Sequence, residues 1–530
     1  MNRLLQRANK HLGLGNVAAL LVTSSLLGQI LGFLRTKLVN ANFNPLGPNS
    51  TDSYFAAFNI PDFFFYTIAA GALGVAFIPV LADRINKSDK EGVNELTSSL
   101  LNLLAIIMFV VGVLIFIFAK PLLHDLVAPG LSPHQLHNAV IIMRFLAFNP
   151  LLFTISGILT SLQQSMGRFF FYALAPIFYN ISIIISIFIF RNNIGLVGLG
   201  IGALAGALIQ LAIVASGLFG LRLKWSPKIF WRRKDFQSVL RNYPARSVDQ
   251  GIDQIESIVE THFANGLGTG NVTYYNNAYI LMSAPTLLIG SAISTAVFPR
   301  LAHRLSQGRP DLFRKDFLMI LRIMIWIIAP VAVISYFSRG YLARMIFTRG
   351  SSQIAVIFGF LTAAIFFNTI YMLISRWFYA QKDTKTPLFI SLFTISLNIF
   401  LAYTLSRPSA YGVAGLAIAQ SLVSAVEVSL LVVIMLFRDH KLFDWDFLNG
   451  IIKIISVTGF SVIAAYSMVS IFPLELADHG VLTLGVKFAA IAAVTFIIHI
   501  GVSALFGMDE PTPILRMLKR IIFKPVKIQY

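Results

Sequence analysis

Apolar segments of about 20 residues recur along the whole chain, and they constrain the fold more than any other feature. A transmembrane helix needs about 20 mostly apolar residues. Only 12% of the residues are charged and 56% are hydrophobic, whereas soluble proteins keep roughly a quarter of their residues charged. The sequence therefore predicts an all-α polytopic membrane protein with about 14 transmembrane helices. The candidate spans are 15–40, 53–82, 96–119, 137–162, 169–190, 195–221, 243–264, 273–299, 317–337, 353–379, 387–405, 412–436, 450–472 and 484–506.

The connections between these spans exclude several classes of protein. The gaps are too short for a soluble domain, and we find no nucleotide-binding loop, zinc-protease motif or serine-hydrolase elbow. The chain has no cysteine, which excludes thiolate metal sites. We therefore expect no enzyme and no cofactor. Transport by such a chain would draw on an ion gradient, the membrane potential or the substrate's own gradient.

The distribution of charge predicts the orientation. The net charge of +19 is best explained by basic inner loops that face anionic lipids, and we expect no nucleic-acid partner. If the N-terminus is cytoplasmic, most Lys and Arg residues fall in inner segments, which satisfies the positive-inside rule. We therefore expect both termini to be cytoplasmic. The inner segments are an amphipathic surface helix at 1–14, a basic loop at 222–242 and a basic tail at 507–530.

The chain also repeats itself. AFIPVLADR at 76–84 returns as AVFPRLAHR at 296–304, and GLVGLGI at 195–201 returns as GVAGLAI at 412–418. The repeat predicts two six-helix lobes of the same topology around a central cavity, which is a recurring plan among transporters. The lobes would cover 15–221 and 243–436, with two additional helices at 450–506. Within the sixth span, Gly202-x-x-x-Gly206 predicts close helix packing.

The seventh candidate span carries an unusual row of acids. They are spaced by four, three and four residues, which places them on one stripe of a helix about 16 Å long. Four unpaired carboxylates in lipid would cost on the order of 10 kcal/mol. The stripe must therefore face water, cations or protein, and we expect it to serve ion coupling or gating. Its members are Asp249, Asp253, Glu256 and Glu260.

Other charged residues lie within spans or at their edges. Such residues either snorkel to the interface, form internal pairs that fix packing, or line a functional cavity. We favour the structural role for Lys37 and Arg322, and a lined cavity for Arg35, while Arg144 stays open between the two. Asp52 stands just before the second span and Arg246 begins the seventh.

Several motifs together resemble the MurJ/MviN family of lipid II flippases, within the superfamily of multidrug, oligosaccharidyl-lipid and polysaccharide exporters. They run in order along the chain, and Asp383-Thr384-Lys385-Thr386-Pro387 is the most specific of them. The resemblance implies a bundle of two lobes with a cationic central cavity and a lipid-tail groove at 450–506. The other motifs are GQILGFLRTKLV (28–39), TDSYFAAFNIP (51–61), GALGVAFIPVLAD (71–83) and SMGRFFFYALAPIFYNISII (165–184).

The family moves an undecaprenyl-pyrophosphate-linked disaccharide peptide from the inner to the outer leaflet of the bacterial cytoplasmic membrane, for cell-wall synthesis. On this resemblance we expect substrate contacts from Arg35, Gln29, Asp52, Arg246 and Arg144, with Asp52 as a gate or ion-pair residue. Membrane lipids and a coupling monovalent ion are further expected partners. Arginine suits a pyrophosphate because its planar fork pairs two phosphate oxygens.

The chain departs from the family pattern in its cavity cations. The first span of the family usually carries two arginines, and here the first position is Gln29 and the second is Arg35. A basic pair after Pro61 is replaced by Phe65 and Tyr66, and an Asp-Arg pair in the eighth span is replaced by Tyr279 and Ile280. Two alternatives to a lipid II flippase therefore remain open. One is a cation or drug antiporter, or a flippase for another polyprenyl-linked saccharide, on the same scaffold. The other is a non-transporting membrane scaffold of cell-wall synthesis.

Overall fold

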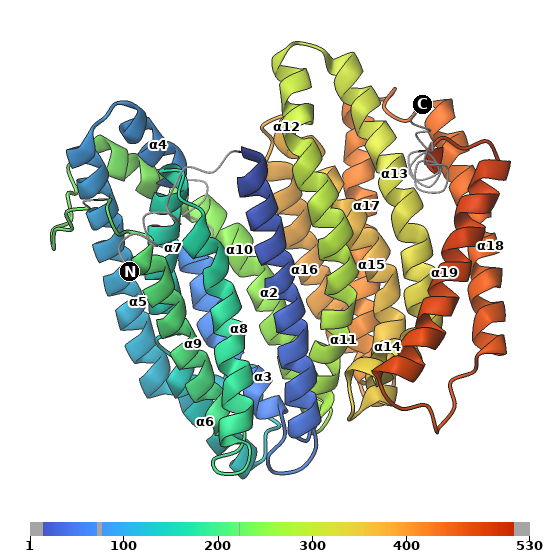
Figure 1. Cartoon of the computed structure of the whole chain (residues 1–530), viewed down its shortest axis with the longest axis horizontal. Helices are drawn as coiled ribbons and strands as arrows, with labels where there is room; N and C mark the ends of the chain where they lie inside the picture. The colour runs from blue at the N-terminus through green and yellow to red at the C-terminus, as the bar shows by residue number, and fades with distance from the viewer. Residues whose placement is uncertain (1–13, 71–76, 222, 513–530) are drawn as a thin grey trace, which may run out of the picture. The chain divides into compact units, whose positions relative to one another are not determined.

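The computed structural model describes residues 14–70, 77–221 and 223–512. Of residues 14–16, 18, 242–250, 252 and 253 it describes the backbone alone. The described chain is helical and contains no β-strand (Figure 1). It divides into two compact units, residues 1–274 (unit 1) and 275–530 (unit 2). The predicted amphipathic helix at 1–14 and most of the basic tail fall outside the described residues.

The described part of unit 1 is a bundle of long helices that includes the π-helical segments η1 and η3. The helices α8 and α9 pack tightly because glycines on α9 let the backbones approach. A Cβ at Gly202 would come 2.1 Å from Ser186 Oγ, and a Cβ at Gly206 would come 2.9 Å from the Tyr179 ring, which confirms the predicted close packing. The elements are α2 (Leu14–Asn42), α3 (Asp52–Phe64), η1 (Phe65–Ala70), α4 (Ile78–Asn86), α5 (Lys90–Pro121), η3 (Leu122–Val127), α6 (Pro133–Leu146), α7 (Asn149–Ser165), α8 (Phe170–Phe190), α9 (Val197–Ser216) and α10 (Lys234–Gly266).

Unit 2 begins within α11 (Asn271–Pro285), and the first turn of this helix belongs to unit 1. A buried polar cluster joins three of its helices: Trp326 Nε1 donates to Ser503 Oγ at 2.8 Å, and His499 Nδ1 lies 2.8 Å from Ser461 Oγ. The remaining elements are η4 (Thr286–Ser291), α12 (Ala292–Ser306), α13 (Pro310–Phe337), α14 (Arg339–Ile346), α15 (Ser351–Ala380), α16 (Lys385–Leu405), α17 (Val413–Arg438), α18 (Trp445–Ile471) and α19 (Val481–Leu505).

Twelve helices of the described chain are long and apolar enough to cross a membrane. The predicted total of fourteen is not confirmed. The two further candidates, 53–82 and 243–264, are helical wherever the structure describes them, but neither is among the twelve. The first contains residues 71–76, which the structure does not describe, and the second lies in α10, which is too polar for the same criterion.

The predicted repeat is visible in the local backbone. The turn between α4 and α5 has Ser88 at φ 57°, and the turn between α12 and α13 has Gly308 at φ 67°, exactly 220 positions later in number. In both turns the next residue donates its N–H to a carbonyl five residues back, Asp89 to Arg84 at 3.0 Å and Arg309 to Arg304 at 3.1 Å. The π-helical segments η1 and η4 follow the same offset within one residue. These local matches agree with the predicted repeat, and the two six-helix lobes stay a prediction.

The helix α10 packs within unit 1, although the sequence repeat assigns it to the second lobe. This helix contacts α3, η1, η3 and α5, all of which belong to unit 1. A Cβ at Gly251 would come 2.6 Å from Thr67 Oγ1, so α10 approaches η1 closely where it has no side chain. The packing boundary lies after α10, whereas the boundary of the sequence repeat is expected before it. The lobe limits of 15–221 and 243–436 stay a prediction about the repeat.

Candidate functional site

Asp52 joins the first turns of two helices. It is fully buried at the start of α3, and its carboxylate accepts hydrogen bonds from the N–H of Gly270 at 2.5 Å and the N–H of Thr273 at 2.8 Å. It also accepts from Thr273 Oγ1 at 2.6 Å. The first N–H groups of a helix have no partner within the helix, and the N-terminus attracts negative charge. One carboxylate therefore caps α11 from outside while it stands at the positive end of α3.

Further hydrogen bonds surround this cap. Thr51 Oγ1 lies 2.8 Å from Thr273 Oγ1, and Ser53 Oγ donates to the carbonyl of Gln135 at 2.9 Å. The side chain of Gln135 donates to the carbonyl of Gly47 at 2.8 Å. We call this set the outer contact, defined by residues 47–53, 130–135 and 265–273. The positive-inside orientation would place it at the outer surface.

Asp52 thus bonds to backbone N–H groups and a hydroxyl, and no ion pair of Asp52 is present among the described side chains. A second polar cluster of unit 1 includes Arg35. Within the outer contact, Asp52 is the side chain that accepts three hydrogen bonds from the start of α11. The gate role of Asp52 stays a prediction.

Arg35 lies in the spanning helix α2, and its guanidinium interacts electrostatically with the carboxylate of Asp62 on α3. The Arg35 guanidinium also acts electrostatically on Tyr54 and Tyr179, and Asp62 acts on Tyr66. The side chains of Arg35 and Asp62 are half-buried. We call these five residues the Arg35 cluster. A charge inside a membrane protein is costly unless it is compensated, and the electrostatic interaction between Arg35 and Asp62 offsets part of that cost here.

The acidic stripe lies on α10, which is helical over the whole predicted segment. Glu260 is buried and Glu256 is half-buried within unit 1, so neither is simply turned toward lipid. Beside them, Asn59 Oδ1 on α3 accepts hydrogen bonds from Ser257 Oγ at 3.2 Å and Thr261 Oγ1 at 3.4 Å. For Arg246, Asp249 and Asp253 the structure describes the backbone in α10, and their side chains lie outside the described part.

The two remaining candidates are exposed. Gln29 is exposed on α2, two turns before Arg35. Arg144 is an exposed residue of α6 whose Nε donates to the carbonyl of Phe116 at 3.2 Å, and its guanidinium lies 5.4 Å from the centre of the Phe116 ring. Because Phe118 interrupts the helical backbone of α5, this bond satisfies a carbonyl beside a kink. The placement of Arg144 therefore fits a bridge between α5 and α6.

The motif that was most specific for the family forms a second cap. Asp383 Oδ1 accepts from the N–H of Thr386 at 3.0 Å, and Oδ2 accepts from Thr386 Oγ1 and from Arg438 Nη2, each at 2.6 Å. Partial burial raises the pKa of Asp383, but the bonds from Thr386 and Arg438 outweigh it and bring the pKa to about 2. Asp383 thus fixes the start of α16 to the end of α17.

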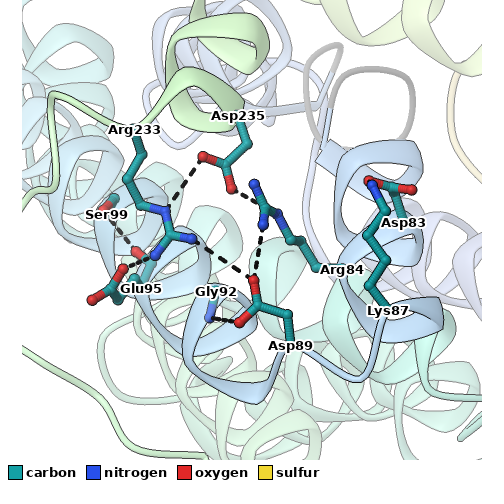
Figure 2. A network of polar contacts seen from close by, with 9 residues as sticks. All are labelled: Asp83, Arg84, Lys87, Asp89, Gly92, Glu95, Ser99, Arg233 and Asp235. Carbon is teal, nitrogen blue, oxygen red and sulfur yellow. Dashed lines mark hydrogen bonds and ion pairs between the residues drawn. The ribbon is translucent and has the colours of Figure 1, made fainter.

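An ion-pair network closes the opposite end of unit 1 (Figure 2). Arg84, at the end of α4, lies 2.8 Å from Asp89 and 3.0 Å from Asp235. Arg233 lies among Asp89, Glu95 and Asp235 and is paired most closely with Glu95. The hydrogen bond from the Gly92 N–H, aided by the two arginines, holds the pKa of Asp89 below its ordinary value. The network fastens the start of α10 to the turn between α4 and α5.

Sequence reasoning did not group Asp62 with Arg35, nor did it find the partners of Asp52. The available signal for Asp62 was its position directly after Pro61 within a candidate span, where a carboxylate needs a partner. No sequence signal pairs Asp52 with Gly270 and Thr273, because they are more than two hundred residues apart and two of the three contacts use backbone groups.

Comparison with known proteins agrees with this architecture. Curated relatives named "probable lipid II flippase MurJ" include one from Rhizobium meliloti, 26% identical over 94% of this chain and 95% of its own. Another, from Borreliella burgdorferi, is 25% identical over 84% of this chain and 88% of its own.

Solved structures of the same fold include a lipid II flippase MurJ in an inward closed conformation. It has a TM-score of 0.76 at 22% identity and covers 92% of this chain and 98% of its own. An inward-facing multidrug MATE transporter of the MOP superfamily has a TM-score of 0.64 at 17% identity, over 81% of this chain and 95% of its own. The family model described as lipid II flippase MurJ matches residues 46–484. The chain therefore belongs to the MurJ lipid II flippase family.

Proposed function

We propose that this chain is a flippase that moves lipid II, or a closely related polyprenyl-pyrophosphate-linked saccharide, from the inner to the outer leaflet of the cytoplasmic membrane. Family membership supports the substrate class. The observation that carries the proposal for this chain is Arg35, a guanidinium held within a spanning helix beside Asp62. A pyrophosphate can take the place of a carboxylate as the partner of an arginine, since both present oxygens to its planar fork.

The transport cycle follows from the two clusters of unit 1. The headgroup binds at Arg35 and weakens its interaction with Asp62, while the lipid tail stays in the bilayer. The outer contact around Asp52 then breaks to let the headgroup leave on the outer side and forms again afterwards. The acids of α10 (Asp249, Asp253, Glu256 and Glu260) supply the coupling to an ion, and both chain termini are cytoplasmic. No step of this cycle makes or breaks a covalent bond in the substrate.

Replacement of Arg35 tests the proposal. Arg35→Ala should abolish complementation of a flippase-deficient strain, and Arg35→Lys should restore it in part, because a lysine keeps the charge but not the fork. Arg191→Ala is the matched control, since Arg191 is an exposed arginine that bonds to Asn42 at 2.9 Å. A fully active Arg35→Ala variant, with expression equal to that of the control, would end the proposed role of Arg35.

A cation or drug antiporter is the second candidate. The observation that favours it is the acidic content of unit 1, where Asp62 interacts with Arg35 and Glu260 is buried on α10. Expression of the chain in a sensitised strain separates the two candidates. The flippase restores growth when lipid II accumulates inside, whereas the antiporter gives resistance to cationic dyes without restoring growth.

A further inference from the structure

The linker between α9 and α10 is held along the first turns of α5, and we call residues 223–233 the strap. Asn102 Nδ2 donates to the carbonyls of Ser226 at 2.7 Å and Lys228 at 3.0 Å. In the first part of the strap, the N–H of Lys224 donates to Asn94 Oδ1, and the N–H of Ser226 donates to Ser98 Oγ. In the last part of the strap, the N–H of Phe230 donates to Ser99 Oγ at 3.0 Å, nearer the start of α5 than Asn102. The strap therefore dips to the level of Asn102 and returns to the network around Arg233.

The sequence of α5 places this dip at the edge of the hydrocarbon layer. The apolar run of α5 begins at Leu100 and continues to Ala119, which is about the length that a bilayer core requires. Asn102 is within the first turn of that run. From Asn94 to Asn102 the helix rises about 12 Å, so the strap lies at the depth of the lipid headgroups and its tip reaches the acyl boundary.

The outward side chains of the strap suit that depth. Trp225 and Trp231 are 59% and 53% exposed, and Trp225 Nε1 donates to Asn102 Oδ1 at 2.9 Å, which fixes the indole at the same level. Tryptophan is enriched at membrane interfaces because its ring is apolar and its N–H is polar. The exposed charges of the strap are all basic, namely Lys224, Lys228 and Arg232.

The strap itself carries no acid. One exposed acid, Glu91, lies in the first turn of α5, and the three acids Asp89, Glu95 and Asp235 are paired with Arg84 and Arg233. They therefore do not neutralise the outward lysines and arginine. A cationic, tryptophan-bearing surface at headgroup depth attracts anionic lipids, by about 1 kcal/mol for each basic residue near such a surface, or about fivefold in affinity.

We propose that the strap is a binding site for anionic phospholipid headgroups in the inner leaflet, with Trp225 and Trp231 in the interface and Lys224, Lys228 and Arg232 bound to lipid phosphates. This site is independent of the transported substrate. It would hold the cytoplasmic end of α10, and the turn between α4 and α5 with it, at a fixed depth in the membrane.

The two strap tryptophans report on their own lipid neighbours. The full-length protein is reconstituted into nanodiscs of phosphatidylcholine and phosphatidylglycerol, in which either lipid carries brominated acyl chains that quench tryptophan. The difference between the wild type and a W225F/W231F variant isolates their signal from that of Trp326, Trp377 and Trp445. We expect brominated phosphatidylglycerol to quench the strap tryptophans more than brominated phosphatidylcholine does, with a preference that decreases as salt rises.

A matched pair of triple variants tests the charge. In K224Q/K228Q/R232Q the preference for phosphatidylglycerol should fall by up to about fivefold per residue, and in K315Q/K385Q/K441Q, which removes three exposed lysines of unit 2, it should not change. The hydrogen bonds of Lys224 and Lys228 in the strap use backbone atoms, so the first variant should fold. Equal quenching by both lipids, no quenching, or an equal loss in both triple variants would each overturn the proposal.

Discussion

Replacement of Asp52 is the sharpest test of the outer contact. The carboxylate is fully buried and accepts bonds from two backbone N–H groups of α11 and one hydroxyl. In Asp52→Ala all three lose their acceptor, whereas in Asp52→Asn an amide oxygen in the place of Oδ1 keeps both bonds from Thr273, and only the Gly270 N–H loses its acceptor. We therefore expect the contact to weaken strongly in the alanine variant and moderately in the asparagine variant.

The magnitude follows from the groups that are left without partners. Thr273 Oγ1 can still pair with Thr51 Oγ1 at 2.8 Å, so two N–H groups remain. An unsatisfied buried donor costs about 1–3 kcal/mol, and the loss of the charge at the helix N-terminus adds about 0.3–1 kcal/mol. For Asp52→Ala we expect about 3 kcal/mol, or roughly a hundredfold larger open population, and for Asp52→Asn roughly tenfold.

Thiol labelling measures this population directly, because the natural chain contains no cysteine. Ser53→Cys introduces a single thiol at a fully buried position of the contact, and its reaction rate with a membrane-impermeant maleimide reports opening. Asp83→Ala is the matched control, since Asp83 is an exposed carboxylate paired only with Lys87 at 2.8 Å. If Asp52→Ala labels no faster than Asp83→Ala, the idea that one carboxylate holds the outer contact is refuted.

Two further predictions concern stability in detergent. Asp383→Ala should lower the free energy of unfolding by about 1–2 kcal/mol, since it removes the cap of α16. The folded-state pKa of Asp383, about 2, lies below its ordinary value of 3.8, so the stabilisation is complete above about pH 4 and is lost as the pH falls toward 2. The unfolding temperatures of the wild type and of Asp383→Ala should therefore converge at low pH. A difference that stays constant with pH would contradict this. Gly130→Ala should lower the unfolding temperature, because its Cβ would come 2.8 Å from the Asn265 carbonyl oxygen. Gly28→Ala is the control and should not lower it, since no atom lies within 4 Å of its Cβ. Equal effects of the two substitutions would show that the close approach at Gly130 is not rigid.

The fold class could be predicted from the sequence because its physical cause is local. Twenty apolar residues in a row must become a helix in lipid, whatever the rest of the chain does. The matching segments 76–84 and 296–304 are each followed by a turn of the same backbone form, which the structure shows at Ser88 and Gly308, while the repeat of six helices stays a prediction. Hydrophobic composition predicts α10 least well among the candidate spans. Its polar residues contact other helices of unit 1, so the helix does not need to be apolar all round.

The candidate site was harder to predict because its partners are distant in sequence. The charge of Arg35 within an apolar segment pointed to a polar interior, but nothing local indicated that it would interact with Asp62, Tyr54 and Tyr179. Asp52 was expected to contact the substrate or to act as a gate, yet a helix cap formed across more than two hundred residues depends on tertiary structure alone. In the sequence the strap could be recognised only as a basic loop. The polar residues of α5 that bind it resemble those at the start of any helix, so they did not predict its position.

Transport by a chain that is reversibly locked at the outer contact tests the central claim most directly. The hydroxyl oxygens of Thr51 and Thr273 are 2.8 Å apart, so T51C/T273C in this cysteine-free chain should form one disulfide under oxidation. In proteoliposomes with a leaflet-specific assay of lipid II, we predict that the oxidised variant moves no lipid II and that reduction restores the rate of the wild type. Movement at the full rate with the disulfide intact would contradict the account.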